Sequence, residues 1–237
     1  MTTDDHGTSR VGLAIPVGPG LVGDLVVPRD PIGVTLFAHG SGSSRFSPRN
    51  RFVAAELNRR GIGTLLCDLL TPAEETDRAN VFDIELLGER LAETTSWLLE
   101  RPDAAGLPPA YFGASTGAAA ALVAAARRGS GLRAVVSRGG RPDLAAARLG
   151  AVDAPTLLIV GGDDIAVLEL NRRAYERLTC PRRLVVVRGA THLFEEPGAL
   201  ERVAELAGDW LVEHLGGRPA PEAPGATDVV VDPVAVR

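Results

Sequence analysis

The clearest absence in this sequence is lysine, because all 25 basic residues among its 237 are arginine. Schiff-base chemistry, a phosphate-loop lysine and a lysine general base are therefore excluded. Cysteine is scarce as well: Cys67 and Cys180 lie far apart, outside any CxxC or Cys/His cluster. Neither a disulfide framework nor a zinc or other metal site is indicated, and we expect both thiols to be buried as small hydrophobic groups.

Long apolar runs are also missing. The longest, around Gly117–Ala126, is alanine-rich and much shorter than the roughly 20 residues that a membrane-spanning helix needs. The N-terminus is polar and carries Asp4 and Asp5 where a signal peptide would have its apolar core. We therefore expect a cytoplasmic protein without a membrane segment.

Charge of one sign does not dominate. The 30 acidic and 25 basic residues give a net charge of −5, and no long run of like charge occurs. A nucleic-acid or anionic-membrane surface is not indicated, so the expected partner is a small molecule. The sequence does not indicate an oligomeric state.

Apolar, β-branched runs alternate with longer helical patterns, which is typical of an α/β fold: a mostly parallel, doubly wound sheet with helices on both faces. We expect about eight strands, the first two forming an antiparallel hairpin: Val11–Val17, Leu21–Val27, Val34–Ala38, Gly63–Cys67, Ala110–Phe112, Arg133–Val136, Thr156–Val160 and Arg183–Val187. The expected helices are Pro48–Arg60, Val81–Leu99, Thr116–Arg128, Asp143–Arg148, Val167–Leu178 and Pro197–Leu215. Ser47 and Pro48 form a good helix start.

The composition also suggests the domain limits. With 45% hydrophobic residues, the chain has enough apolar material for one sizeable core, expected over residues 11–215 after a polar tail at 1–10. Residues 216–237 begin with a Pro/Gly/Ala-rich stretch, which we expect to be a disordered tail or linker. The short apolar run Val229–Val231 leaves open whether the end of the chain docks on the body as an extended strand.

A candidate nucleophile lies in Gly113-Ala114-Ser115-Thr116-Gly117, which follows an apolar strand and precedes an alanine-rich helix. A G-x-S-x-G nucleophile elbow needs small residues two before and two after the serine, because neighbouring backbone comes close to this strained turn. The strand, motif and helix together predict that Ser115 is a nucleophile.

Acyl chemistry also needs backbone donors for a developing oxyanion, one of them from the residue after the nucleophile. Thr116 is expected to supply that donor. The second is expected from Ser41, in the glycine-rich loop that starts at His39 and follows the strand Val34–Ala38. His39 is expected to brace this loop by hydrogen bonds.

Three histidines remain as candidates for the general base. His6 lies in the polar tail, and His214 falls in the last turn of a helix, where histidine commonly contacts free carbonyls. His192 follows the strand Arg183–Val187 and precedes the last helix, so its loop can present the imidazole to the elbow. We therefore predict His192 as the base.

The acid of a triad should follow a strand between the serine and the histidine in chain order. Asp163 and Asp164 both follow Thr156–Val160, and the spacing to Val167, where the next helix opens, favours Asp164 over Asp163. Asp143, after the preceding strand, is a weaker third candidate.

Two arginines are candidates for contact with a substrate anion. Arg138 is expected just beyond the strand Arg133–Val136, and Arg45 lies in the loop after the proposed oxyanion donor. Either guanidinium could bind a carboxylate with two hydrogen bonds. The alternative, which we favour, is that both are solvated or paired with acids such as Asp143 and Asp68.

Several of these motifs together resemble the dienelactone-hydrolase-like branch of the α/β hydrolases, over about residues 10–215. They are the loop at 39–44, Ser47-Pro48-Arg49-Asn50, Asp68-Leu69-Leu70-Thr71, the elbow, Gly161-Gly162-Asp163-Asp164 and Ala190-Thr191-His192. Within that branch the chain is similar to the group found beside or fused to phosphoribosyltransferases, although it contains no phosphoribosyltransferase motif. Dienelactone hydrolases proper use a cysteine nucleophile, whereas position 115 is serine.

The sequence thus predicts a serine hydrolase for a small ester, thioester or lactone, which acts through an acyl-enzyme and requires no metal or cofactor. The segment between Val136 and Thr156 is only long enough for one helix, so little or no cap is expected over the site. An acyltransferase with the same triad and a non-catalytic binding protein with this fold remain alternatives.

Overall fold

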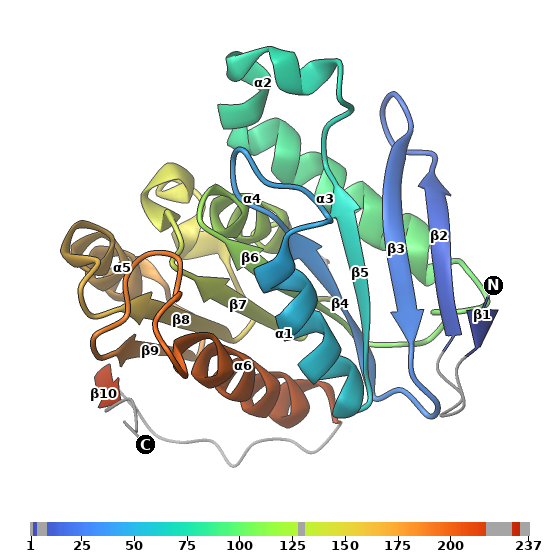
Figure 1. The fold of residues 1–237 in the computed structure, drawn as a ribbon. Coiled ribbons are helices and arrows are strands. Elements are labelled where there is room, and N and C mark those ends of the chain that lie inside the picture. Colours follow the sequence, from blue (N-terminus) through green and yellow to red (C-terminus); the bar gives the residue numbers. More distant parts are fainter. Residues whose placement is uncertain (1, 4–8, 128–130, 217–228, 233–237) are drawn as a thin grey trace.

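A twisted sheet with helices on both faces forms the body of the computed structural model, which describes residues 2–3, 9–127, 131–216 and 229–232 (Figure 1). Within these residues the sheet has ten strands in the order β1-β2-β3-β5-β4-β6-β7-β8-β9-β10. Their bounds are β1 Thr2–Thr3, β2 Ser9–Ile15, β3 Leu21–Val27, β4 Gly33–Ala38, β5 Ile62–Asp68, β6 Pro109–Ala114, β7 Ala134–Arg138, β8 Thr156–Gly161, β9 Arg182–Val187 and β10 Val229–Asp232.

Strand order reverses in the middle of the sheet, and this reversal positions the site. Strands β4 to β10 pair parallel with one another, whereas β1 pairs antiparallel with β2, and β3 pairs antiparallel with both β2 and β5. The chain places β5 on one side of β4 and β6 on the other, with Ala38 in register with Gly113. In such sheets the crevice at the carboxyl ends of the two central strands is where ligands bind.

Six α-helices in the described part of the chain cover the sheet: α1 Pro48–Arg59, α2 Arg78–Phe82, α3 Ile84–Leu99, α4 Thr116–Ala125, α5 Ile165–Arg177 and α6 Ala199–Leu215. Two hydrophobic clusters result, one on each face. Leu91, Leu122 and Leu168 of α3, α4 and α5 belong to one cluster. Val53 of α1 and Trp210 of α6 belong to the other, on the face turned to the viewer in Figure 1. Burial of both faces explains why the central strands are almost wholly apolar.

All eight expected strands are present, and β1 and β10 extend the sheet at its two edges. Strand β10 pairs parallel with β9, so the run Val229–Val231 does dock on the body as an extended strand. The rest of the expected C-terminal tail, residues 217–228 and 233–237, lies outside the described residues, as does His6.

Two expected helices need correction. The pattern at Val81–Leu99 is split at Asp83, whose side chain accepts the backbone N–H of Leu86 and starts α3 anew. The expected helix Asp143–Arg148 is instead a pair of short 3₁₀ turns, Pro142–Ala145 and Leu149–Ala151. A segment this short does not offset the cost of nucleating an α-helix, and 3₁₀ turns are common in such connections.

The expectations for the start of α1 and for the burial of the two cysteines are confirmed. The Ser47 side chain accepts the N–H of Asn50, with Pro48 in the first turn of α1. Both cysteines are buried and free, and burial raises the pKa of the Cys67 thiol to about 12. None of the helices in the described ranges combines the length and apolar character that crossing a membrane requires.

No cap is inserted between β7 and β8. A short excursion at residues 71–83 instead follows β5 and carries the 3₁₀ turn Glu74–Thr76 and helix α2, beyond the carboxyl end of β5 in Figure 1. Its base is fixed by Glu74, which accepts hydrogen bonds from Thr71 and from the buried Arg90. This short excursion therefore projects at the carboxyl edge of the sheet, where an inserted cap domain could otherwise lie.

Candidate active site

Ser115 occupies a strained turn between β6 and α4. Its backbone has φ 52° and ψ −122°, a conformation that L-residues adopt only where the surroundings enforce it. A Cβ on Gly113 would lie 2.4 Å from the Ala118 Cα, and one on Gly117 would lie 2.2 Å from the Ala38 carbonyl oxygen. Both glycines are therefore required by close backbone contact, as expected for a nucleophile elbow.

The structure brings Ser115, His192 and Asp164 together from three separate loops. Ser115 Oγ lies 3.2 Å from His192 Nε2, and His192 Nδ1 lies 2.6 Å from Asp164 Oδ2. The Asp164 side chain is largely buried, at 15% exposed, while that of His192 is 38% exposed. This is the order of contacts in which an acid orients an imidazole and the imidazole contacts a hydroxyl.

The other candidates for the acid and for the base do not contact Ser115 or His192 in the described structure. Asp163 is exposed, although it neighbours Asp164 in sequence. Asp143 binds Arg141 through two hydrogen bonds of 2.8 and 2.7 Å. The His214 Nδ1 contacts the Trp210 carbonyl oxygen at 2.8 Å within α6, as expected for a histidine in the last helical turn.

The two expected oxyanion donors are neighbours. The Ser41 N–H donates to the Thr116 hydroxyl over 2.8 Å, which ties the loop after β4 to the residue after Ser115. Sequence reasoning identified both residues through their backbone N–H groups but missed this role of the Thr116 side chain. The pairing could not be found from local sequence, because the two residues are 75 positions apart.

His39 contacts its own loop, as expected. Its Nδ1 donates to the Gly40 carbonyl over 3.0 Å, and its Nε2 lies 3.5 Å from Asp68 Oδ1. Burial raises the pKa of Asp68, but hydrogen bonds from His39 and Arg45 outweigh it and hold that pKa below its ordinary value. Asp68 therefore remains a carboxylate that fixes both residues.

The two candidate arginines have different surroundings. Arg45 is paired with two acids. Its backbone N–H donates to Asp68 over 2.6 Å, and its guanidinium pairs with the same carboxylate. Its Nε lies 3.8 Å from Asp24. The expected pairing alternative is thus confirmed for Arg45. Arg138 pairs with neither of the acids proposed for it, since Asp68 binds Arg45 and Asp143 binds Arg141.

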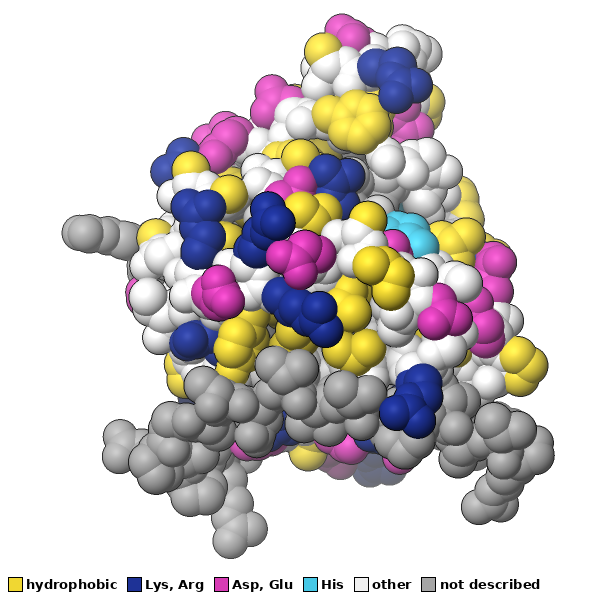
Figure 2. Space-filling view, turned by 90° about the vertical axis from the view of Figure 1, so that its left-hand side faces the viewer, with side chains coloured by type: hydrophobic (Ala, Val, Ile, Leu, Met, Phe, Trp, Pro, Cys, Tyr) yellow, Lys and Arg dark blue, Asp and Glu magenta, His cyan; other side chains and the backbone are white. Residues whose placement is uncertain are grey.

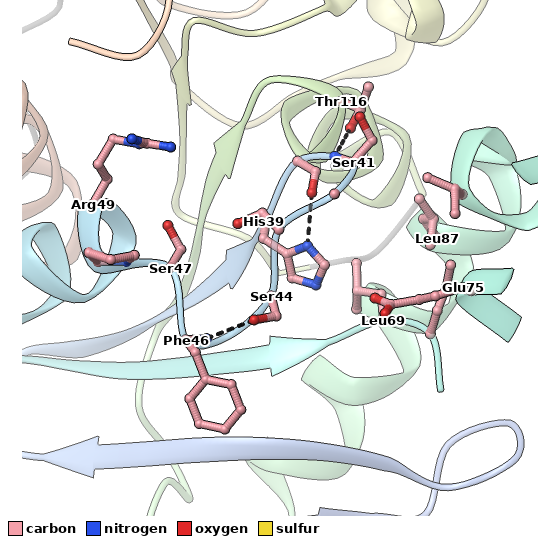
Figure 3. Close-up of a pocket in the computed structure, with 16 residues that line it drawn as sticks. His39, Ser41, Ser44, Phe46, Ser47, Arg49, Leu69, Glu75, Leu87 and Thr116 are labelled. Atoms are coloured by element: carbon pink, nitrogen blue, oxygen red, sulfur yellow. Dashed lines mark hydrogen bonds between the residues drawn. The ribbon is translucent and has the colours of Figure 1, made fainter. Parts of the chain in front are cut away.

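A cleft of about 620 Å³ lies beside the two expected oxyanion donors. Ser41 and Thr116 line its middle, Leu69 and Leu87 line one end, and Arg49 extends from α1 at the opposite end (Figure 3). The cleft thus joins an apolar end to a cationic end across the expected oxyanion donors. Sequence reasoning did not single out Arg49, whose only local signal is its place in the first turn of α1.

Surface charge and possible metal ligands were the two other features considered in the sequence. On the face shown in Figure 2, acidic and basic side chains are interspersed without a large patch of one sign. In the described part of the chain, no three His, Cys, Asp or Glu side chains are grouped so that they could hold a metal ion.

No family model matches the chain, whereas a solved structure does at high sequence identity. The crystal structure of dienelactone hydrolase from Anabaena variabilis ATCC 29413 is 53% identical and has a TM-score of 0.85. The match covers 88% of this chain and 99% of that one. This chain belongs to the dienelactone-hydrolase-like α/β hydrolases.

More distant solved structures share the fold of this dienelactone-hydrolase-like protein. Est1E from Butyrivibrio proteoclasticus has a TM-score of 0.74 at 15% identity, covering 86% of this chain and 98% of its own. The dienelactone hydrolase-like promiscuous phosphotriesterase P91 from metagenomic libraries has a TM-score of 0.69 at 16% identity, covering 87% and 98%. At these identities the likeness concerns the fold alone.

Curated relatives are longer than this dienelactone-hydrolase-like chain. It is 64% identical over 197 residues to a Mycobacterium tuberculosis H37Rv protein named "Putative phosphoribosyl transferase Rv0571c". The match covers 83% of this chain but 44% of that protein. The chain therefore spans less than half the length of the curated relative.

Proposed function

We propose that this hydrolase cleaves small carboxylic esters, thioesters or lactones through an acyl-enzyme on Ser115. The observation that carries the proposal is the continuous chain of contacts from Ser115 Oγ through His192 to Asp164, at 3.2 and 2.6 Å. The strained backbone at Ser115 supports it, because such strain is kept where a side chain must be presented in one direction.

In the first half of the proposed reaction, Ser115 Oγ attacks the carbonyl carbon of the substrate while His192 Nε2 takes the hydroxyl proton. The carbonyl oxygen becomes an oxyanion, which the backbone N–H groups of Thr116 and Ser41 stabilise. The C–O or C–S bond to the leaving group then breaks, and His192 returns the proton to that group. The acyl group remains on Ser115 as an ester.

In the second half, a water molecule replaces the leaving group and His192 takes its proton as it attacks the acyl carbon. Collapse of the second oxyanion releases a carboxylic acid and returns the proton to Ser115. Asp164 acts through His192: it accepts a hydrogen bond from the Nδ1 N–H, which leaves Nε2 free as the base, and it stabilises the imidazolium form.

The Ser41 N–H has a second task in this scheme. In the unliganded protein it donates to the Thr116 hydroxyl, which keeps the loop after β4 close to the elbow. The oxyanion must share or take over this donor as negative charge develops. The contact therefore holds the donor near its working position, which reduces reorganisation during the reaction.

The decisive experiment labels the protein with a fluorophosphonate probe and measures the hydrolysis of p-nitrophenyl acetate. We expect the label on Ser115, and we expect Ser115→Ala to lose labelling and at least about a thousandfold of the turnover. Ser96→Ala, which changes an exposed serine on α3, serves as the matched control and should keep both. Labelling of the Ser115→Ala protein to the same extent would show that the nucleophile lies elsewhere.

A further inference from the structure

Arg138, the last residue of β7, is a buried cation with unmet hydrogen-bonding capacity. It is 7% exposed, and its Nε and Nη1 have no hydrogen-bond partner among the described residues. Burial, together with the nearby charge of Arg49, lowers its pKa to about 10, so the group stays positively charged at neutral pH. A buried charge without a partner is costly, and such groups in native proteins call for an explanation.

Acids that could neutralise Arg138 bind other residues. Asp143 forms a pair with Arg141, and Asp68 forms a pair with Arg45. The ring of Phe194 lies near the guanidinium and is apolar, with its centre 5.8 Å from Cζ. Phe194 itself is held at φ 56°, a strained backbone position, two residues after His192. The surroundings therefore keep a cation in place without supplying its counter-ion.

A second guanidinium with a free donor lies in the same neighbourhood, because Phe194 lies against Arg138 and the next residue, Glu195, accepts a hydrogen bond from Arg49. The Arg49 Nε is also buried and without a partner in the described part of the chain, while its Nη1 donates to Glu195 over 2.9 Å. The Arg49–Glu195 pair is solvent-accessible, with side chains 34% and 63% exposed. Such a pair contributes little stability, so Arg49 can leave Glu195 for a better partner.

Both arginines adjoin the proposed site of acyl transfer. The Arg138 carbonyl accepts the Ser115 N–H over 3.1 Å, so this residue is directly paired with the elbow. Arg49 lines the cleft at the end opposite Leu69 and Leu87 (Figure 3). An anionic group bound at the Arg49 end of the cleft would belong to a molecule that extends along the cleft to Ser41 and Thr116, the residue after Ser115.

We propose that Arg138 and Arg49 form a binding subsite for a phosphate monoester group, so that the substrate is an acyl ester of a small phosphorylated compound. The inference rests on the proposed function, because it names the substrate class of the same site. A phosphate monoester carries nearly two negative charges at neutral pH and three acceptor oxygens. The N–H groups on the Arg138 Nε and Nη1 and the Arg49 Nε match that set better than the two oxygens of a carboxylate do.

The anion enters from the cleft and displaces Glu195 from Arg49. This step is needed because the Arg49 Nη1 donates to Glu195. The unpartnered nitrogens of Arg138 are buried, so the groups around them must also move apart to admit the anion. Glu195 therefore competes with the ligand for Arg49. The arrangement predicts that removing the Glu195 carboxylate tightens phosphate binding, which a purely structural Arg49–Glu195 pair would not do.

The first test measures binding of inorganic phosphate by titration calorimetry to the Ser115→Ala protein, in which no turnover is needed. We expect saturable binding that Arg138→Met or Arg49→Met weakens about 10- to 100-fold, the range for charged hydrogen bonds. Glu195→Ala should bind phosphate more tightly. Arg141→Met is the matched control, since it removes a paired arginine from the same edge of the sheet, and should bind as the parent does.

The second test compares kcat/KM for 2-acetoxyethyl phosphate, 3-acetoxypropanoate and uncharged 2-acetoxyethanol. We expect the phosphate ester to be preferred over the uncharged one by about 10- to 100-fold, with the carboxylate ester between them. Arg138→Met and Arg49→Met should bring the ratio of phosphate ester to uncharged ester close to one, while Arg141→Met keeps it. The ratio is taken within each variant, so a general loss of activity cancels.

The outcomes separate this inference from the proposed function. Hydrolysis of all three esters at equal rates, with no phosphate binding, would overturn the subsite and leave the acyl-enzyme proposal intact. Phosphate binding without hydrolysis of any ester would retain the subsite and contradict the proposed reaction. A preference for the carboxylate ester over the phosphate ester would overturn the phosphate assignment.

Discussion

Two arginines of this protein are equally buried, each 7% exposed, yet their surroundings are opposite. Arg90 on α3 donates to both carboxylate oxygens of Glu74, at 2.6 and 2.9 Å, and to the Leu69 carbonyl at 2.9 Å. Arg138 on β7 has two nitrogens without a partner in the described residues. Burial alone therefore does not reveal what a charged residue does, whereas the completeness of its hydrogen bonds separates a structural cation from one kept for a ligand.

The same difference holds for the regions around them. At the base of the excursion at 71–83, the closed region, the hydrogen bonds of the ion pair are complete, because Glu74 also accepts from the backbone N–H and the hydroxyl of Thr71. The carboxyl edge near Ser115, the open region, instead holds a strained backbone and the buried Arg138, which has no counter-ion among the described residues. Sites that bind ligands commonly give up stability in this way. Mutations in the two regions should therefore differ in whether they change activity or stability.

The largest effect should come from the acid of the proposed triad. We expect Asp164→Asn to lower turnover of p-nitrophenyl acetate about 10³- to 10⁴-fold, because the amide favours the wrong imidazole tautomer, with little change in stability. Asp163→Asn, at the exposed neighbour, should cost less than about tenfold. Steady-state kinetics of both purified variants decides the matter, and the opposite ranking would assign the role to Asp163.

In the closed region the effect should be on stability. Glu74→Gln leaves the buried Arg90 without a counter-ion and should lower the free energy of unfolding by about 3 kcal/mol, the low end for a buried pair because a quarter of the Glu74 side chain is exposed. Urea denaturation measures the change. The control is Glu85→Gln, which breaks the exposed pair with Arg148 and should change the free energy of unfolding far less, because solvent screens that pair. Equal losses in the two variants would show that the Glu74–Arg90 pair contributes no more to stability than the exposed Glu85–Arg148 pair.

Acid should weaken the closed region by a smaller amount. Hydrogen bonds from Arg90 are the main cause that lowers the Glu74 pKa to about 2, from an ordinary value of 4.5. Since the folded protein holds this carboxylate deprotonated more strongly than the unfolded chain does, the stabilisation is complete above pH 4.5 and is lost as the pH falls toward 2. Urea denaturation between these pH values should show a steeper loss in the wild type than in Glu74→Gln, and parallel curves would refute the linkage.

The smallest change in stability is expected at the open region. Arg138→Met replaces an uncompensated buried charge with an apolar side chain of similar length, so the free energy of unfolding should stay constant or rise by about 1 kcal/mol. The matched change in the closed region, Arg90→Met, should be destabilising because it leaves Glu74 unpaired. Thermal and urea denaturation of both variants test the comparison. A loss in Arg138→Met as large as that in Arg90→Met would mean that Arg138 is structural.

Much of this molecule was determined by local sequence. The alternation of apolar runs with helical patterns predicted the eight main strands and the α/β class, because the spacing of apolar residues in each segment follows the periodicity of its own secondary structure. The elbow around Ser115 was predictable for a similar reason: only glycine fits at 113 and 117, where a Cβ would come within 2.4 and 2.2 Å of backbone atoms. His192 was identified by its place between a strand and the last helix.

Tertiary structure decided the pairings between distant residues. Spacing favoured Asp164 over Asp163, but only the turn after β8 shows which carboxylate reaches the His192 Nδ1, since neighbouring side chains on a turn point in different directions. The Ser41–Thr116 contact likewise depends on how two distant loops approach each other.

The charges depended on tertiary structure most of all. Arg45 and Arg138 are indistinguishable as sequence candidates, yet the fold places Asp68 against the first and leaves no described acid for the second. The physical reason is that an ion pair is set by approach in space, whereas strands, helices and the elbow are set by the conformational limits of consecutive residues.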